Sequence, residues 1–436
     1  MANDLAELPY AHTPGAPGIK TKLTVMMLLE FFIWGAWLPP LFHLMGSEGL
    51  AFSGWQQFAI GSCFAIASVI GIFFSNQFAD RTFSAEKFLA FSHLVGGAAL
   101  IGLFFAKSFA PFFALMLIHS LFYVPTISVA NSLAFANLTN PTKDFGPVRM
   151  GGTIGWILAA WPLYFILKGK TGAALASAEA YVFLLSGVAS FALAAFCLTL
   201  PHTPPKPAVE GEDSLAWRKA IGLLANPFLL VLFIVTFIDA TIHNGYFVTA
   251  FGFLADIGFS AEQIMPIMSI GQVAEILTMA VLGTVLAKLG WRTTMIVGIL
   301  GHAARYAVFA FFPTNGALIV GVQVLHGICY AFFFATVYIF IDAAFPKDVR
   351  ASAQGLFNLL ILGLGDLAAK GLFVPLMDKL KITVGTGEAA KQMIDYQKLF
   401  LVPVGLALVA AVLLAVAFKP PAEITTASEG GGNAPH

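Results

Sequence analysis

The chain has 436 residues, of which 58% are hydrophobic and only 11% are charged, with a formal net charge of zero and a mean hydropathy of +0.85. A soluble domain carries about 25% charged residues, so the composition excludes an ordinary soluble protein, predicts an all-α integral membrane protein in contact with a lipid bilayer, and gives no sign of a nucleic-acid partner. The three cysteines lie in separate apolar segments without metal-binding or disulfide spacing, and we expect neither a metal nor a cofactor.

Apolar stretches that are long enough to cross a bilayer recur along the chain. A spanning helix needs about 20 such residues, and twelve stretches meet this length. They cover residues 22–44, 54–76, 88–106, 109–135, 147–168, 180–199, 226–254, 262–287, 292–312, 315–343, 351–377 and 398–418.

A polar stretch with four prolines, Pro201 to Ala220, separates the first six apolar segments from the last six. Lys and Arg are more frequent on the side of the membrane that holds this stretch and both chain ends, so these parts are predicted to be cytoplasmic. The predicted units are an N-terminal six-helix bundle at 1–200, a cytoplasmic linker at 201–222, a C-terminal six-helix bundle at 223–418 and a disordered cytoplasmic tail at 419–436.

In the first segment, Glu30, Trp34 and Trp37 recur at helical spacing and share one face. Glu30 is either a protonatable site or a carboxylate that extends toward the membrane interface. The wide ring of Trp34 is suited to stacking on a flat substrate, although packing is the alternative role.

The fifth segment carries a similar face, formed by Arg149, Thr153 and Trp156. Arg149 is either a cavity residue or a cytoplasmic anchor, and Thr153 either contacts a ligand or bonds to its own helix backbone. The glycines between Arg149 and Trp156 favour close helix packing.

The seventh segment is unusually polar for a spanning helix. Asp239 and His243 are four residues apart, a spacing that permits a charge-assisted pair. Because histidine titrates near neutral pH, His243 is a candidate for proton coupling, with a self-satisfied structural pair as the alternative. Asn244 offers donors and an acceptor for a base or sugar edge.

In the eighth segment, Gln272 and Glu275 lie in the middle of the apolar stretch Ile264 to Leu286, which contains no other charged residue. Their spacing of three places them on one side of a helix. A charge at this depth costs roughly 3 kcal/mol and usually faces a bundle interior or a water-filled cavity. Glu275 is therefore the first candidate for a proton or substrate site, with a packing carboxylate as the alternative.

Later segments carry further polar groups. His326 and Tyr330 belong to an aromatic stripe whose polar tips need partners. Arg305 has no obvious partner in the sequence. We expect it to contact Asp239, Asp342 or a lipid headgroup. In the eleventh segment, Asp366 and Lys370 have the spacing of an internal ion pair, which we expect to be structural rather than substrate-binding. The chain has no Walker loop, nucleophile elbow or zinc-ligand helix, so it is not predicted to be an enzyme.

The twelve segments, the central linker and the Ala79-Asp80-Arg81 loop together resemble the major facilitator superfamily, although Asn76 replaces the usual glycine of that loop. Within it, the chain is identified as a member of the nucleoside:proton symporter family and resembles the bacterial nucleoside permeases. The stretches that carry this resemblance are Leu29 to Leu38, Tyr123 to Thr126, Val148 to Trp156, Thr199 to His202, Met268 to Glu275 and Val349 to Gly355.

The resemblance implies a multi-pass protein of the cell inner membrane that imports nucleosides with protons, with the substrate site near midplane between the halves. Four family site positions are occupied by identical residues, Arg149, Thr153, Gln272 and Glu275.

Other family positions differ. The departures are Trp156 for phenylalanine, Asn244 for glutamine, Phe247 for asparagine, His326 for tyrosine, Tyr330 for phenylalanine and Ala331 for an acidic residue. Without that acidic residue, proton coupling is expected to use Glu275, Glu30, Asp239 or His243.

We therefore predict that a nucleoside stacks between Trp34, Trp156 and Tyr330 and bonds to Gln272 and Asn244, in a protein that works as a monomer. Two alternatives remain on the sequence alone. One is a facilitator or symporter of the same fold for sugars or another small polar solute, and the other is a nucleoside sensor that does not transport.

Overall fold

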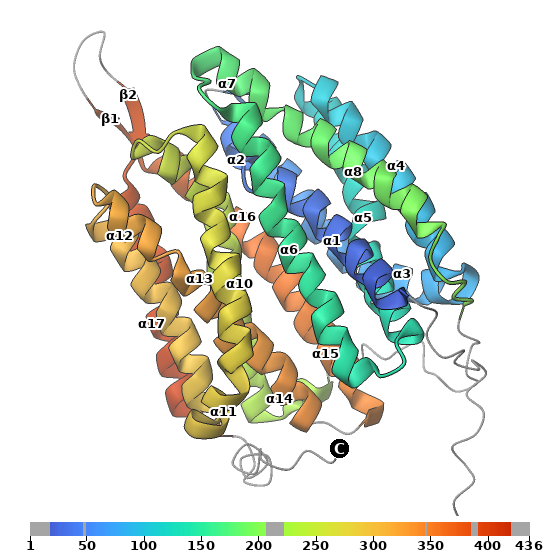
Figure 1. Cartoon of the computed structure of the whole chain (residues 1–436). Helices are drawn as coiled ribbons and strands as arrows, with labels where there is room; N and C mark the ends of the chain where they lie inside the picture. The colour runs from blue at the N-terminus through green and yellow to red at the C-terminus, as the bar shows by residue number, and fades with distance from the viewer. Residues whose placement is uncertain (1–17, 47–48, 206–221, 345–346, 385–390, 420–436) are drawn as a thin grey trace, which may run out of the picture.

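A computed structural model describes residues 18–46, 49–205, 222–344, 347–384 and 391–419, and it is almost entirely helical over these ranges (Figure 1). Most of the predicted linker at 201–222 and nearly all of the predicted tail at 419–436 lie outside the described residues.

The described residues of the first half of the chain form eight α-helices, of which α2 and α7 are short. Their bounds are α1 (Ile19–Trp37), α2 (Leu41–Met45), α3 (Gly54–Thr82), α4 (Ala85–Phe105), α5 (Phe109–Asn137), α6 (Pro141–Leu167), α7 (Gly172–Glu179) and α8 (Tyr181–Cys197). Several begin at polar caps. At the start of α3, for example, Ser53 and Gln56 bond to each other's backbone N–H groups in a capping box.

The second half contains longer and more irregular elements, including two π-helical stretches. They are η1 (Leu223–Ala225), α10 (Pro227–Asp256), α11 (Ala261–Phe311), α12 (Gly316–Gly321), α13 (Val324–Cys329), η2 (Tyr330–Ala335), α14 (Thr336–Ala344), α15 (Lys347–Asn358), η3 (Leu359–Leu364), α16 (Gly365–Lys379) and α17 (Tyr396–Ala417).

Ten helices of the described residues are long and apolar enough to cross a membrane. The predicted segments 262–287 and 292–312 both fall within α11, a run of 51 residues interrupted by the non-helical backbone of Gly290, with φ 70° and ψ 173°. The segment 54–76 lies in α3, which is helical but is not among the ten. The multi-span character is thus confirmed, and the count of twelve stays a prediction.

A two-stranded hairpin, which the sequence did not predict, lies between α16 and α17. Strands β1 (Lys381–Val384) and β2 (Lys391–Ile394) pair antiparallel, with Lys381 opposite Ile394. Figure 1 shows the hairpin and α7 at one end of the molecule, and α14 and α15 at the other.

The helices meet along seams that bring distant parts of the sequence together. Helix α1 packs against α6 and α8, and α10 packs against α16 and α17. Between the two halves of the sequence, α6 contacts α11, and α3 contacts α16 and η3. These contacts place α1, α6, α10 and α11 around a common region.

Glycines allow the closest of these approaches. A Cβ atom at Gly155 would lie 2.0 Å from the carbonyl oxygen of Leu28 in α1, and one at Gly327 would lie 2.1 Å from the backbone nitrogen of Glu275 in α11. Neither contact leaves room for a methyl group, so the expected role of glycine in close helix packing is confirmed for Gly155.

Gly155→Ala is expected to lower the stability of the protein by roughly 1–3 kcal/mol, because the backbone of α1 must move away from the added methyl group. Gly283→Ala is the matched control, since nothing lies within 4 Å of a Cβ at that position. Thermal unfolding in detergent measures both. Equal unfolding temperatures for the two variants would contradict the close packing of α1 on α6.

Candidate functional site

Aromatic rings from both halves of the sequence meet where α1, α6 and α10 converge. Trp34 and Trp156 pack edge to face with ring centroids 5.3 Å apart, and Trp156 packs in the same way on Phe247 at 5.7 Å. Phe64 of α3 stacks on Trp34 at 4.7 Å with an interplanar angle of 12°. One face of Trp34 is therefore already covered by a protein ring.

The same series of rings continues into the second half of the sequence. Phe247 packs on His326 with centroids 5.7 Å apart, and His326 stacks on His243 at 4.8 Å. Tyr330, in the π-helical stretch η2, lies 6.1 Å from the His243 ring. The structure thus joins the six aromatic candidates Trp34, Trp156, Phe247, His326, His243 and Tyr330 in one continuous series.

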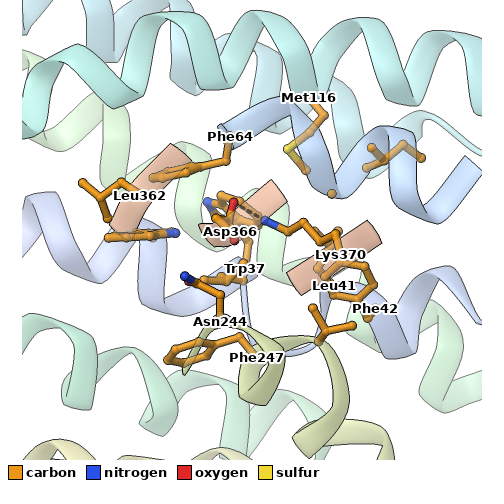
Figure 2. A pocket seen from close by; sticks show the side chains of 15 residues that line it. Trp37, Leu41, Phe42, Phe64, Met116, Asn244, Phe247, Leu362, Asp366 and Lys370 are labelled. Carbon is orange, nitrogen blue, oxygen red and sulfur yellow. Dashed lines mark hydrogen bonds and ion pairs between the residues drawn. The ribbon is translucent and has the colours of Figure 1, made fainter. Parts of the chain in front are cut away.

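A narrow pocket, here called the inner pocket, lies beside this series (Figure 2). Its volume of about 20 Å³ is close to that of a single water site, so a larger solute requires the surrounding helices to move. It is lined by Trp34, Trp37, Leu38, Leu41, Phe42, Ile60, Gly61, Phe64, Met116, Asn244, Phe247, Val248, Leu362, Asp366 and Lys370.

Asn244 is held in a fixed orientation at the inner pocket. Its Nδ2 donates to the carbonyl oxygens of Ala240 at 2.9 Å and of Ile361 at 3.0 Å. Both donors of the amide are thus used by the backbone, and Oδ1 is the group that remains to accept a hydrogen bond. The sequence predicts that the Asn244 amide both donates to and accepts from a ligand, whereas in the structure its Oδ1 can accept but its Nδ2 donors are already in use.

Gln272 Oε1 and the Glu275 carboxylate have no hydrogen-bond partner among the residues that the structure describes. Gln272 is 6% exposed and its Oε1 has no hydrogen bond. With Trp156 and Phe247 it lines a second small cavity. None of the described residues forms a hydrogen bond or ion pair with Glu275. The alternative of a packing carboxylate satisfied by a neighbour is therefore not observed among these residues.

Arg149 supplies the positive charge that acts on Glu275. Its guanidinium lies 4.0 Å from the centroid of the Phe31 ring, in a cation–π contact. The hydroxyl of Thr153, one turn further along α6, has no hydrogen-bond partner among the described residues, so the alternative of a bond to its own backbone is not observed. Both side chains are half-buried.

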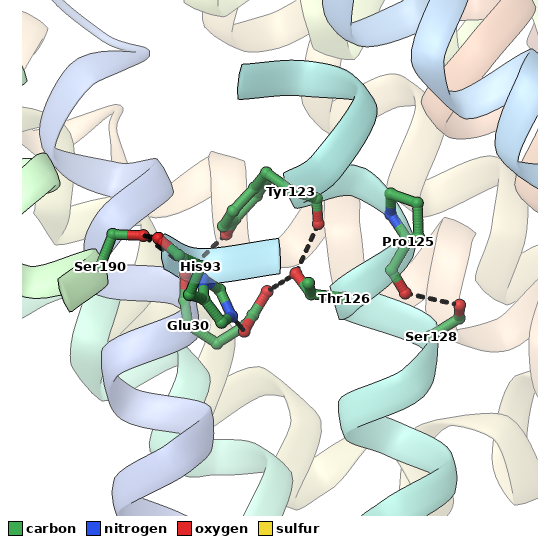
Figure 3. A network of polar contacts seen from close by, with 7 residues as sticks. All are labelled: Glu30, His93, Tyr123, Pro125, Thr126, Ser128 and Ser190. Atoms are coloured by element: carbon green, nitrogen blue, oxygen red, sulfur yellow. Dashed lines mark hydrogen bonds and ion pairs between the residues drawn. The ribbon is translucent and has the colours of Figure 1, made fainter. Parts of the chain in front are cut away.

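Glu30, by contrast, is completely buried and fully bonded (Figure 3). His93 Nε2 lies 2.8 Å from Glu30 Oε2, and the Thr126 hydroxyl donates to Oε1. Tyr123 donates to the Glu30 carbonyl oxygen at 2.6 Å, and Ser190 to that of His93 at 2.8 Å. Glu30 does not extend to the interface; its contacts tie α1 to α4 and α5, and Ser190 of α8 joins the network through His93.

The expected pair of Asp239 and His243 does not form. Asp239 is completely buried, its nearest ionic partner is His302 Nε2 at 3.6 Å, and neither carboxylate oxygen makes a hydrogen bond. The His243 ring instead packs against the rings of His302 and His326, both of which contact Arg305.

Arg305 also finds partners that the sequence did not suggest. Its guanidinium donates to His326 Nδ1 at 2.6 Å and to His302 Nδ1 at 3.3 Å, and lies 4.3 Å from the Tyr246 ring centroid. Arg305 is completely buried, so it does not reach a lipid headgroup, and no hydrogen bond or ion pair joins it to Asp239; the side chain at 342 lies outside the described residues. The signal in the sequence was present, since His302 and Arg305 are one turn apart on an apolar helix.

The predicted internal ion pair is confirmed. Lys370 Nζ donates to the Asp366 carboxylate within α16, and both side chains line the inner pocket (Figure 2). The sequence did not show that this pair borders the same pocket as Asn244. The residue pattern of one helix does not reveal which neighbouring helix each of its faces will meet.

Comparison with known proteins places this arrangement in a family. The profile of the family described as Nucleoside H+ symporter matches residues 18–423. The chain belongs to the nucleoside H+ symporter family. It is 34% identical to the putative nucleoside transporter YegT of Escherichia coli strain K12 over 369 residues, covering 82% of this chain and 84% of that protein. It is 28% identical to the xanthosine permease of the same organism, over 92% of this chain and 96% of that protein.

A solved structure agrees with this assignment. A crystal structure of the nucleoside transporter NupG superposes with a TM-score of 0.79 at 25% sequence identity, covering 92% of this chain and 100% of that chain. The predicted family is thus confirmed, and this symporter-family member is a multi-span membrane transporter rather than an enzyme.

The contrast between Glu30 and Glu275 predicts opposite effects of the same substitution. Glu30→Leu is expected to lower the stability of the symporter by roughly 3 kcal/mol or more, because it leaves the buried His93 without its ionic partner. Glu275→Leu removes a carboxylate that bonds to no described residue, and is expected to leave stability unchanged or to raise it. Thermal unfolding in detergent distinguishes the two, and a loss of equal size in both would refute the assignment of a structural role to Glu30.

Proposed function

We propose that this protein imports nucleosides together with protons by alternating access. The observation that carries the proposal is the pair Gln272 and Glu275, which lies at the seam between α6 and α11 and for which the described part of the chain offers no hydrogen-bond partner to Gln272 Oε1 or to the carboxylate. Buried polar groups are normally paired, so these two are the groups that a polar substrate and a proton would satisfy. Membership of the symporter family supports both ligands.

The proposed substrate site contains the series of aromatic rings and the polar groups beside it. The flat nucleobase would pack against Trp156 and the free face of Trp34, with Tyr330 at the far side. Gln272 would donate to or accept from the substrate, and Asn244 would accept through Oδ1. The full set is Trp34, Arg149, Thr153, Trp156, Asn244, Phe247, Gln272, Glu275, His326 and Tyr330.

Proton coupling follows from the cost of enclosing an unpaired charge. When the site closes around the substrate, a charged Glu275 loses water, and Arg149 is the charge among the described residues that compensates it. Protonation removes that cost, and a hydrogen bond from the substrate reduces it. Proton and nucleoside would then both favour the closed state, which links their binding thermodynamically. Asp239 and His243 remain candidates for a second proton site, and Glu30 is the least suited because its oxygens are already bonded.

The small volume of the inner pocket supports a cycle in which the cavity opens and closes. It holds about 20 Å³, whereas sites for small-molecule ligands occupy about 300–1,000 Å³. A nucleoside would therefore enter only after the helices around the pocket separate.

We also propose that the chain has twelve spans, arranged in the two six-helix bundles of the major facilitator fold. Both termini and the linker would lie in the cytoplasm. The protein would work as a monomer in the inner membrane of the cell. The helix contacts within each half of the sequence support the two bundles. The hairpin would then lie on the outer side.

Replacing Glu275 tests the coupling. In proteoliposomes, Glu275→Gln is expected to abolish accumulation of uridine under an imposed pH gradient while uridine counterflow persists, since the amide cannot release a proton. Glu262→Gln, in the first turn of the same helix, is the control and should accumulate uridine normally. Accumulation against a gradient by Glu275→Gln would exclude Glu275 as the coupling residue.

Cysteine labelling tests the topology. The native cysteines Cys63, Cys197 and Cys329 are buried, so added surface cysteines dominate labelling. A membrane-impermeant maleimide is expected to label Lys381→Cys in intact cells and to label Lys20→Cys only after lysis. The side chains of Lys381 and Lys20 are 50% and 59% exposed, so a difference in labelling reports the side of the membrane and not burial. The reverse pattern would invert the proposed orientation.

A further inference from the structure

The inner pocket contains two charged side chains that the proposed function does not use. Asp366 is 8% exposed and Lys370 is 3% exposed, and they are the charged members of the pocket lining. They project from one face of α16 toward Phe64 and Met116 on the opposite wall (Figure 2). A buried ion pair is weak evidence of stabilisation, because the cost of removing both charges from water offsets their attraction. Stabilisation of the fold therefore does not by itself explain why this ion pair lines the pocket.

Unpaired donors line the same pocket. The indole N–H groups of Trp34 and Trp37 are buried and have no hydrogen-bond partner. Trp37 is only 1% exposed, so water does not compensate its N–H group. A buried donor left unpaired costs about 1–3 kcal/mol, and two such donors beside an ion pair indicate a ligand that accepts as well as donates.

A larger cavity, here called the outer cavity, adjoins the inner pocket on the hairpin side. It has a volume of about 350 Å³, and Phe42 and Val248 line both cavities. A solute of nucleoside size that enters the outer cavity is thus separated from Lys370 by these shared residues. The outer cavity is lined by Phe42, His43, Gly46, Ala51, Phe52, Gln57, Val248, Thr249, Gly252, Asp256, Val374, Met377, Asp378, Lys381, Gln392, Met393, Ile394 and Tyr396.

The chemistry of the inner pocket matches a vicinal diol. The Asp366 carboxylate bonds to Lys370 and has further lone pairs, so it can accept from two neighbouring hydroxyl groups. Lys370 has donors left for a hydroxyl oxygen, as do the indole N–H groups. Because the pair is neutral as a unit, it can bind an uncharged polyol without leaving a net charge buried.

We propose that Asp366, Lys370 and Trp37 form the subsite for the ribose of the nucleoside, an inference that rests on the proposed function. The carboxylate accepts from the 2′- and 3′-hydroxyls, and the ammonium and the Trp37 indole donate to the sugar oxygens. The base then lies toward Trp34 and Phe247, which line the inner pocket and belong to the aromatic series. Asp366 and Lys370 are thereby specificity residues for ribonucleosides.

The test compares binding of uridine and 2′,3′-dideoxyuridine to the full chain in detergent by calorimetry. The wild-type protein is expected to bind uridine at least about tenfold more tightly, since each lost bond to a charged group weakens binding by roughly this factor. In the double variant Asp366→Asn/Lys370→Met, which leaves no lone charge, the ratio is expected to fall to about two or less. This ratio of the two affinities does not change with the fraction of the protein that is folded, because both compounds are measured on the same sample.

Two further variants separate recognition from structure. Asp366→Lys/Lys370→Asp keeps an ion pair but reverses its direction, so a purely structural pair predicts an unchanged ratio and ribose recognition predicts its loss. Asp395→Asn/Lys398→Met removes an exposed ion pair at the start of α17 and should keep the wild-type ratio. Trp37→Phe, which removes an N–H group and keeps an apolar ring, is expected to lower the ratio at least twofold even if the charge variants do not fold.

The outcomes are distinguishable. If the wild-type protein binds neither compound, the proposed function fails. If it binds both equally, or if the double variant, the reversed pair or Trp37→Phe keeps the wild-type ratio, nucleoside transport stands and the ribose subsite is overturned.

Discussion

Inside a bundle of membrane helices, a polar side chain has no water to bond to, so it must find a partner in the protein or in a ligand. The protein meets this requirement in two ways. Around Glu30, every oxygen of the carboxylate has a donor from α4 or α5, and the result is a rigid junction of helices. Around Gln272 and Glu275 the requirement is left unmet by the described residues, and these are the groups that we propose to bind substrate and proton.

Helix α1 carries both a fully bonded polar group and a residue of the aromatic series. Glu30 bonds to residues of α4 and α5, whereas Trp34, one turn later, contacts Phe64 and Trp156. The close approach of α6, made possible by Gly155, holds Trp156 against Trp34. The bonded junction at Glu30 and the aromatic contacts of Trp34 thus lie one turn apart on α1, so the junction helps to hold the Trp34 ring in place.

The comparison with NupG shows how much of this arrangement tolerates sequence change. At 25% identity the fold superposes with a TM-score of 0.79. Packing of apolar helices depends on small residues at crossing points and on apolar volume, and both can be met by many sequences. The polar partners are more specific, and the cluster of Arg305 with His302 and His326 shows one such choice in this chain.

The sequence by itself determined the all-helical membrane character, the positions of the apolar segments, the family, and the ion pair of Asp366 with Lys370. These follow from local composition, spacing and motifs. Only the tertiary structure decided which polar groups are paired. It bonded Glu30 to His93 across 63 residues, placed Asp239 beside His302 rather than in a pair with His243, and brought the Asp366–Lys370 pair to the pocket of Asn244. Helical periodicity shows which residues share a face, but the neighbour that a face meets depends on how the other helices pack, and that information is not contained in any single segment.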